Sequence, residues 1–359
     1  MNLRGQAVYV GLSGGVDSAV SAALLKRAGA RVTGVFIKGW YPPGMPCTWA
    51  EDRRDAMRVA AHLRIPFRTL DASEEYRRGV IDYLLREYAD GRTPNPDVMC
   101  NRDVKFGAFA RYAKERGAAY LATGHYARIT HDGGETHVLR GSDPAKDQSY
   151  FLWAVSKAAL DMTLFPVGGM EKIHVRSQAR RFGLPVASKR DSQGICFLGA
   201  VSVEEYLRTE FSPIAGKALD EDGGEAGTHD GAVLYTLGER VALRDAAAGP
   251  WYVVGKRMRD NELIVSHSAR PQGIFEAPRA LSLFEVNLLA PCTGPVTAQY
   301  RYHGQRVSGT FTKKGARGGI FVPEMPLSDY VATGQSLALY AGDELLGGGI
   351  IDGIHGTVS

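Results

Sequence analysis

The first 130 residues alternate between two patterns of hydrophobic and polar positions. The apolar run at 6–12 is typical of a buried parallel strand. Apolar residues recur at helical spacing over 16–28, Gly29 stands where a helix C-terminal cap belongs, and a second strand is expected at 31–37. This strand-helix-strand unit predicts a parallel sheet, with its first strand-to-helix turn where such sheets bind ligands.

The alternation continues along the chain. We expect helices at 51–63, 74–88 and 104–116, a strand at 67–70, and a strand that ends in a loop at 118–126. The segment TPNPDVMCN at 93–101 is expected to be a loop, because its two prolines are separated by one residue. The segments ARIT and THVL, separated by Asp132, Gly133 and Gly134, predict a hairpin.

Beyond about residue 200 the helical periodicity fades and glycines multiply. The segment 296–311 places Val296, Ala298, Tyr300 and Tyr302 on one face at a period of two. Short strands of this kind suggest small β barrels or sandwiches. The pattern therefore predicts an α/β head followed by a largely β tail.

The composition is that of a globular protein, with 44% hydrophobic and 23% charged residues. No apolar run is long enough to span a membrane, and the N-terminus does not resemble a signal peptide, so a cytoplasmic location is expected. The four cysteines form no C-x-x-C motif, which disfavours a zinc site and a disulfide scaffold; no metal ligand set is expected. Cys292 and Cys47 are interpreted as structural thiols.

The formal net charge is +4, and the basic residues gather in two stripes. The segment 172–190 has six lysines and arginines, the segment 301–317 has five, and neither contains an acidic residue. Such stripes fit contacts with a nucleic-acid backbone, and they fit a solvated basic face equally well.

The turn GLSGGVDS at 11–18 has the composition of a phosphate-binding loop without the usual lysine. Its glycines and serines offer neutral donors to an anion at the start of a helix, and Asp17 could hold Mg²⁺. Neutral donors suit pyrophosphate as a leaving group, which predicts ATP cleaved between its α and β phosphates. The alternative is a Gly-Ser turn that opens an ordinary helix. The sequence SGGVDS resembles the fingerprint of the PP-loop ATP-pyrophosphatases, but this loop does not choose among members of that superfamily.

Two cysteines help to choose among the members of this superfamily. Cys100 in NPDVMCNRDVKF and Cys196 in DSQGICF are each expected in an exposed loop, where nearby basic residues could favour a thiolate. The basic residues in question are Lys105, Lys189 and Arg190. Spacing alone does not show that the two cysteines meet.

The segments GLSGGVDS, NPDVMCN, TGHYAR, KDQSYFL, DSQGICFLG and RYH resemble, in order and context, the bacterial tRNA-specific 2-thiouridylase family. The resemblance extends from Gly11 to TGQSLALY near the end. It implies an α/β PP-loop catalytic domain over 1–205, a small central, mainly β domain over 206–278, and a C-terminal β barrel over 279–359.

In that family ATP adenylates the C2 oxygen of the wobble uridine of tRNA. The resemblance implies that a persulfide on Cys196 supplies the sulfur and that Cys100 attacks or resolves it, so that the pair can pass through a disulfide. A cysteine desulfurase or a sulfur-relay protein would donate the sulfur.

The resemblance also assigns roles residue by residue. It implies ATP contacts by Gly11, Leu12, Ser13, Gly14, Gly15, Val16, Asp17, Ser18, Ile37 and Gly124. It implies contacts with the target base by Asn95, Pro96 and Asp97, of which Asp97 is the candidate to handle a uridine proton. Further tRNA contacts are implied for His125, Lys146, Asp147, Gln148, Arg301, Tyr302 and Gln335. The family often has methionine where Ile37 stands, a swap that is harmless if the backbone makes the contact.

Three alternatives stay open. A PP-loop amide ligase or amidotransferase needs no cysteine pair, and no glutaminase segment is recognisable. A 4-thiouridine synthase is chemically closer, but its extra domains are not recognisable. A tRNA-binding protein without turnover would have no need of Cys100, Asp97 and Cys196.

Overall fold

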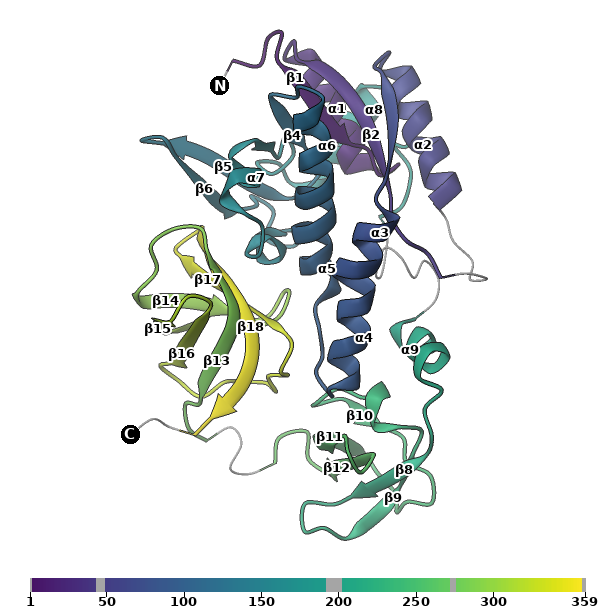
Figure 1. Cartoon of the computed structure of the whole chain (residues 1–359), viewed down its shortest axis with the longest axis vertical. Helices are drawn as coiled ribbons and strands as arrows, with labels where there is room; N and C mark the ends of the chain where they lie inside the picture. The colour runs from purple at the N-terminus through teal and green to yellow at the C-terminus, as the bar shows by residue number, and fades with distance from the viewer. Residues whose placement is uncertain (1, 43–48, 192–201, 272–275, 357–359) are drawn as a thin grey trace.

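The computed structural model describes residues 2–42, 49–191, 202–271 and 276–356. These residues form three sheets, and the third combines strands from the α/β part with strands from the C-terminal part. Figure 1 shows the α/β part at the top, a small β unit below helix α4, and a β barrel beside helices α4 and α5. The expected α/β head and β tail are therefore confirmed.

The first sheet has five strands in the order β3-β2-β1-β4-β7, and all its pairs are parallel. Its strands are β1 (Ala7–Gly11), β2 (Arg31–Lys38), β3 (Phe67–Asp71), β4 (Tyr120–Ala122) and β7 (Thr163–Leu164). The strand order reverses between β1 and β4, since the chain moves outward to β2 and β3 before it returns. The carboxyl ends of β1 and β4 therefore form the crevice where open parallel sheets bind ligands.

Helices cover this sheet. They include α1 (Val16–Arg27), α2 (Trp49–His62), α7 (Lys157–Asp161) and α8 (Lys172–Arg181). Helix α1 ends as expected: Gly29 has φ +85°, and the Ala30 N–H donates to the Leu25 carbonyl. Buried valines and alanines of α1 pack against β1, β2 and α8, which fixes the turn at 11–18 above the sheet.

The expected loop at 93–101 is wrong. Its second half is helical, as α5 (Pro96–Met99) continues into the π-helical turns η2 (Cys100–Ala108) and then into α6 (Phe109–Glu115). The Asn95 side chain caps the helix by accepting from the Val98 N–H at 3.3 Å, and Pro96 occupies the first turn. Proline is favoured there because its missing N–H would have no partner within the helix. The helix expected at 74–88 is present as α3 (Ser73–Tyr76), η1 (Arg77–Ile81) and α4 (Asp82–Ala89).

The predicted hairpin is confirmed as β5 (Ala127–Asp132) and β6 (Glu135–Arg140), joined by Gly133 and Gly134 at positive φ. It belongs to the third sheet, in which β6 meets β18 at the pair Leu139 and Glu344. Six strands of that sheet close into a barrel through the pairing of β13 with β18. They are β13 (Ala280–Leu288), β14 (Gly294–Gln299), β15 (Val307–Lys314), β16 (Gly318–Pro323), β17 (Ser336–Ala341) and β18 (Glu344–His355).

The barrel core confirms most of the period-two pattern. Val296, Ala298 and Tyr300 are buried inside the barrel with Cys292, whose structural role is thereby confirmed. Tyr302 lies beyond the end of β14 and packs instead against the α/β part.

The second sheet has the order β10-β11-β12-β8-β9. Its strands are β8 (Gly216–Leu219), β9 (Glu225–His229), β10 (Arg240–Val241), β11 (Trp251–Arg257) and β12 (Glu262–Ser266). Helix α9 (Val203–Phe211) precedes it, and two short 3₁₀ turns occur at η3 (Ser149–Leu152) and η4 (Ala232–Leu234). The domain limits at 205 and 278 stay predictions. Among the described residues, no helix combines the length and apolar character that a membrane span requires.

Candidate active site

The turn at 11–18 joins β1 to α1 and is held by its own serines. The Ser18 hydroxyl accepts from the Ser13 N–H at 3.2 Å and donates to the Gly15 carbonyl at 3.2 Å. Gly14 has φ +78°, and a Cβ there would lie 2.4 Å from the Asp52 carbonyl oxygen. Within the described part of the chain no side chain caps α1 at Gly15, so the N–H groups of its first turn can bind an anion. The local pattern therefore builds the expected anion-binding turn.

Gly124 follows β4 and lies against this turn. A Cβ on Gly124 would lie 2.6 Å from the backbone nitrogen of Ser18 and 2.8 Å from the carbonyl carbon of Asp17. Only glycine permits this close approach of two backbones. A Cβ on Gly11 would lie 3.5 Å from the Phe109 ring and 3.8 Å from Ile37, so the predicted ATP contact Ile37 lies at the same end of the sheet.

The cation that the turn lacks is supplied by α8. The Lys172 ammonium lies 2.7 Å and 2.8 Å from the two carboxylate oxygens of Asp17, and the Tyr126 hydroxyl donates to Asp17 at 2.8 Å. The Lys172 side chain is only 13% exposed. Burial, followed by the charge of Asp17, raises the pKa of Tyr126, so its hydroxyl stays a donor. Sequence reasoning missed Lys172; the only signal was its place at the start of a basic stripe.

Asp191 collects three of the basic side chains around it. Its carboxylate lies 2.8 Å from Lys172, 2.6 Å from Arg176 and 3.1 Å from Lys146. Burial opposes ionisation of Asp191, but the hydrogen bonds from Lys172 and Lys146 outweigh it and lower its pKa to about 2. Lys172 and Arg176 of the stripe at 172–190 thus form ion pairs within the protein. The stripe is therefore neither a purely solvated face nor a purely nucleic-acid-binding one.

Lys189 was expected to favour a thiolate at Cys196. Its ammonium instead lies 2.8 Å from Asp52 and 2.7 Å from Asp55, both on α2. Cys196 and Cys47 lie outside the described residues.

Helix α5 positions the residues predicted to meet the target base. Asn95 caps it, and its first turn contains the buried Pro96 and the partly buried Asp97. Burial raises the pKa of Asp97, while the charge of Lys105 in η2 lowers it. Cys100 follows at the start of η2 and is 5% exposed, so the expected exposed loop is wrong for this cysteine.

His125 is buried, although it was predicted to contact tRNA. Its Nδ1 lies 2.7 Å from the Thr123 hydroxyl, and its ring packs between Phe106 and Phe165. Burial, assisted by the charge of Lys105, lowers the pKa of His125 well below its usual value. The imidazole is therefore neutral, and in this structure it connects β4 to η2.

The three residues 146–148 differ in exposure and partners. Lys146 is 39% exposed in its pair with Asp191. The Asp147 carboxylate accepts from the N–H groups of Gly141 and Ser149 and pairs with Arg140 at 3.2 Å. The Gln148 side chain accepts from the Tyr126 N–H at 3.0 Å. Lys146 is thus the member of the three best placed to reach a ligand outside.

The predicted contacts in the β tail meet the α/β part. Arg301 is exposed and donates to the Tyr330 carbonyl at 2.8 Å. The ring of Tyr302 packs on Phe151, with centroids 4.5 Å apart. Gln335 donates to the carbonyls of Thr93 and Pro94 at 2.8 Å and 3.3 Å. The barrel therefore adjoins the segment that leads into α5.

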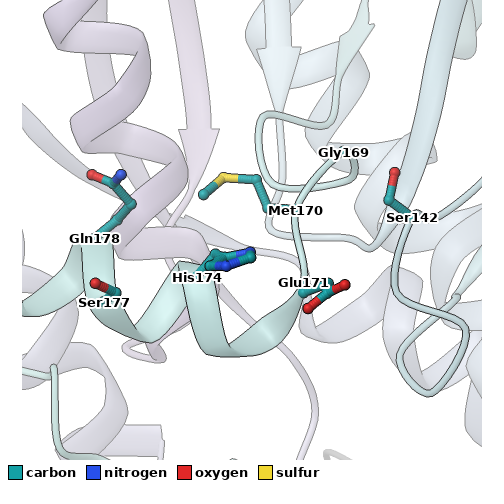
Figure 2. A pocket seen from close by; sticks show the side chains of 7 residues that line it. All are labelled: Ser142, Gly169, Met170, Glu171, His174, Ser177 and Gln178. Atoms are coloured by element: carbon teal, nitrogen blue, oxygen red, sulfur yellow. The ribbon is translucent and has the colours of Figure 1, made fainter.

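A pocket of about 410 Å³ lies along the first half of α8. Figure 2 shows its lining: Ser142, Gly169, Met170, Glu171, His174, Ser177 and Gln178. No predicted site residue that the structure describes is among them. Nor do the described ranges contain a cluster of three His, Cys, Asp or Glu side chains suited to a metal ion.

A parallel sheet with this glycine- and serine-rich turn at its switch point defines the class of the chain, a nucleotide-binding α/β enzyme domain with two β domains appended. Three family models match in sequence: the tRNA methyl transferase HUP domain over residues 6–200, the tRNA methyl transferase PRC-barrel domain over 204–267, and the aminomethyltransferase beta-barrel domain over 286–351.

Full-length relatives narrow this class. The chain is 41% identical to the tRNA-specific 2-thiouridylase MnmA of Enterococcus faecalis, over 96% of this chain and 95% of that one. It is 42% identical to the protein of the same name from Akkermansia muciniphila, over 97% and 99%. It is 41% identical to MnmA 2 of Geobacillus kaustophilus, over 96% and 94%. The chain belongs to the tRNA-specific 2-thiouridylase family.

Proposed function

We propose that this chain transfers sulfur to C2 of the wobble uridine of tRNA, using ATP to activate the C2 oxygen. The observation that carries the proposal is the likeness, over nearly the whole chain, to relatives named tRNA-specific 2-thiouridylase. The uncapped turn at 11–18 and the helix that carries Asp97 and Cys100 support it. We propose the cytoplasm as its location, because thiols stay reduced there.

ATP would bind where β1 and β4 end. The N–H groups at the start of α1 would hold its phosphates, and Gly124 would let the nucleotide lie close to the backbone. Lys172 is placed to neutralise the departing pyrophosphate. Mg²⁺ would supply further charge to the phosphates, with Asp17 as its protein ligand. Lys172 contacts both Asp17 oxygens, so a metal bound there would either share the carboxylate with this lysine or displace it.

Sulfur transfer can proceed by thiol exchange, in which every bond formed replaces a bond broken. The C2 oxygen attacks the α phosphorus of ATP, and pyrophosphate leaves. The terminal sulfur of a persulfide on Cys196 then attacks C2, and AMP leaves with the oxygen. Finally the Cys100 thiolate attacks the inner sulfur, which releases the thiocarbonyl and forms a Cys100–Cys196 disulfide. An external reductant supplies two electrons to restore both thiols, and a desulfurase or relay protein renews the persulfide.

A second order of events uses the same atoms: Cys100 attacks the persulfide first and releases hydrosulfide, which then attacks C2. The two routes differ in whether tRNA is ever bonded to Cys196. Both require the wobble base to leave its stack and approach Asn95, Pro96 and Asp97. We propose Lys146, Arg301 and Tyr302 as tRNA contacts at the surface, and His125, Asp147, Gln148 and Gln335 as contacts that need local movement, given their partners.

The test is nucleoside mass spectrometry on unmodified tRNA incubated with the protein, Mg-ATP, a cysteine desulfurase, cysteine and a reductant. The expected product carries sulfur in place of oxygen on the wobble uridine, and it is absent without ATP. A methyl increment would instead support the activity in the names of the family models. If neither change occurs and no pyrophosphate forms with any tRNA, the amide-ligase alternative becomes the better proposal.

We predict that Lys105→Met shifts the acid limb of the pH-rate profile to higher pH. The Lys105 charge stabilises the Asp97 carboxylate against burial, so its removal raises the pKa of Asp97 further. A base with a higher pKa loses its proton acceptor at a higher pH as the solution is acidified. The measurement is kcat/KM for tRNA as a function of pH, from neutral pH down to the acid side on which the rate falls.

Two other titratable groups respond to the charges of Lys105 and Asp97. Removal of Lys105 also relieves part of the downward shift in the pKa of His125, but burial, the larger cause of that shift, remains. Burial, followed by the charges of Asp147 and Asp97, raises the pKa of Tyr302 to about 12, so its hydroxyl does not ionise on the acid side. The matched control is Lys114→Met on the exposed side of α6, which should leave the limb in place. An unmoved limb in Lys105→Met would show that another group than Asp97 sets it.

A further inference from the structure

The segment 92–94, a junction that joins α4 to α5, contacts both the barrel and the central β unit. In Figure 1 the chain there returns alongside α4 on the side that faces the barrel. The Thr93 N–H donates to the Thr333 carbonyl of the barrel at 2.8 Å. The Thr93 hydroxyl donates to the Thr236 hydroxyl, next to η4 of the central unit, at 3.3 Å.

Most contacts between the barrel and this segment come from one turn of the barrel, residues 332–336. Gln335 donates to the carbonyls of Thr93 and Pro94. Its neighbour Gly334 has φ +89°, and a Cβ there would lie 3.0 Å from both the Arg92 Cβ and the Thr93 carbonyl oxygen. Arg92 itself pairs with Asp352 of the barrel at 2.7 Å. The N–H, hydroxyl and carbonyl of Thr93 and the carbonyl of Pro94 are thus all hydrogen-bonded to the barrel or to the central unit.

The turn 332–336 is itself fixed within the barrel. The Gly334 N–H donates to the Ile351 carbonyl and the Ile351 N–H donates to the Gln335 carbonyl, each at 2.8 Å. The Ser336 carbonyl accepts from the buried Tyr150 hydroxyl at 2.9 Å. A displacement of this turn therefore cannot be absorbed locally and reaches the backbone at Thr93.

From the structure we infer that Gly334 and Gln335 are positioning residues for Cys100 and Asp97. Pro94 is followed directly by Asn95, whose side chain caps α5, and Cys100 begins the next helical turn. The barrel thus sets where that helix starts and how its first turns are aimed. The role of the two residues in catalysis rests on the proposed function. Their effect on how well α5 and η2 are ordered does not, because that order can be measured without turnover.

The test compares Gly334→Ala and Gln335→Leu in the full-length protein. Gly334→Ala adds strain at positive φ and crowds Arg92 and Thr93; Gln335→Leu removes the two donated hydrogen bonds. Both should speed alkylation of Cys100 by iodoacetamide and hydrogen exchange at 98–104 on the order of tenfold. In Gly334→Ala, kcat for thiolation should fall on the order of tenfold while KM for tRNA stays near the wild-type value.

The matched control is Gly294→Ala. Gly294 has φ +92° in the same barrel, but a Cβ there meets nothing within 4 Å. It carries similar backbone strain without touching the junction, so alkylation and exchange should stay at the wild-type rate. Gln335 is also a proposed tRNA contact, so its variant alone would not separate the two roles.

Unchanged alkylation and exchange in both Gly334→Ala and Gln335→Leu would overturn the inference, whatever happens to activity. Equal acceleration in Gly294→Ala would overturn it too, because general loosening of the barrel would then explain the effect. If the wild-type protein forms no thiolated nucleoside, the proposed function fails, while the alkylation and exchange measurements still decide the positioning role.

Discussion

Cys100→Ser is expected to lower the rate of sulfur transfer to tRNA on the order of 10³-fold or more, the scale seen when a nucleophile is removed. A serine hydroxyl is not ionised near neutral pH and cannot undergo exchange with a persulfide sulfur. The change of one atom leaves the turn at 11–18 untouched, so tRNA-dependent release of pyrophosphate should persist. Nucleoside mass spectrometry and a pyrophosphate assay on the same reactions measure both quantities.

This variant also separates the two orders of the sulfur step. If Cys100 resolves a bond between tRNA and Cys196, Cys100→Ser should accumulate tRNA on the protein, visible on a denaturing gel and released by reductant. If Cys100 attacks the persulfide first, no such adduct forms. The matched control is Cys292→Ser, the same exchange at a buried thiol whose pKa burial raises to about 11. It should keep turnover; full activity in Cys100→Ser would remove Cys100 from the reaction.

The parallel sheet and its ligand turn could be predicted because their signals are local. The apolar run of β1, the helical spacing of α1 and the cap at Gly29 are each decided within a few neighbouring residues. The same holds for the hairpin at Gly133 and Gly134. Local propensity and tertiary packing agree at these places, so the sequence pattern is sufficient.

The helix at Cys100 could not be predicted because proline is ambiguous in sequence. Pro96 would break a helix from the interior, but it favours one from the first turn, and the deciding factor is the Asn95 cap. Burial of Cys100 and His125 depends in turn on contacts of η2 with segments far away in sequence, among them η1, η3 and α7. The junction at Thr93 is less accessible still, since its partners come from residues 236, 333 and 335.

Lys172 is the clearest example of a site residue whose partners only the tertiary structure reveals. It lies 155 positions from Asp17 in sequence, and only the packing of α8 against α1 brings the two together. The basic stripe at 172–190 predicts a face in contact with solvent or nucleic acid. In the structure three of its members instead neutralise Asp17, Asp191, Asp52 and Asp55. Charge patterning along a chain does not reveal such internal pairing, because the carboxylates belong to other elements.

Lys172→Met is therefore expected to lower kcat/KM for ATP on the order of 10²-fold, about 2.7 kcal/mol. The ammonium lies at the start of α1, where the phosphates would bind, and it is shielded from solvent. A partly desolvated cation stabilises departing pyrophosphate more strongly than one in water. Lys172→Arg keeps the charge and should recover a large part of the loss. Initial rates of tRNA-dependent pyrophosphate release at varied ATP give the constant.

Lys146→Met separates this role from a purely structural one. Lys146 also pairs with Asp191, so its loss removes a comparable ion pair from the same cluster. As a proposed tRNA contact it should raise KM for tRNA and leave kcat/KM for ATP near the wild-type value. If both methionine variants lose the same factor with ATP, the cluster only holds the fold together. If Lys172→Met keeps its kcat/KM for ATP, pyrophosphate departs without this lysine, and the N–H groups of α1 and Mg²⁺ must supply the compensating charge.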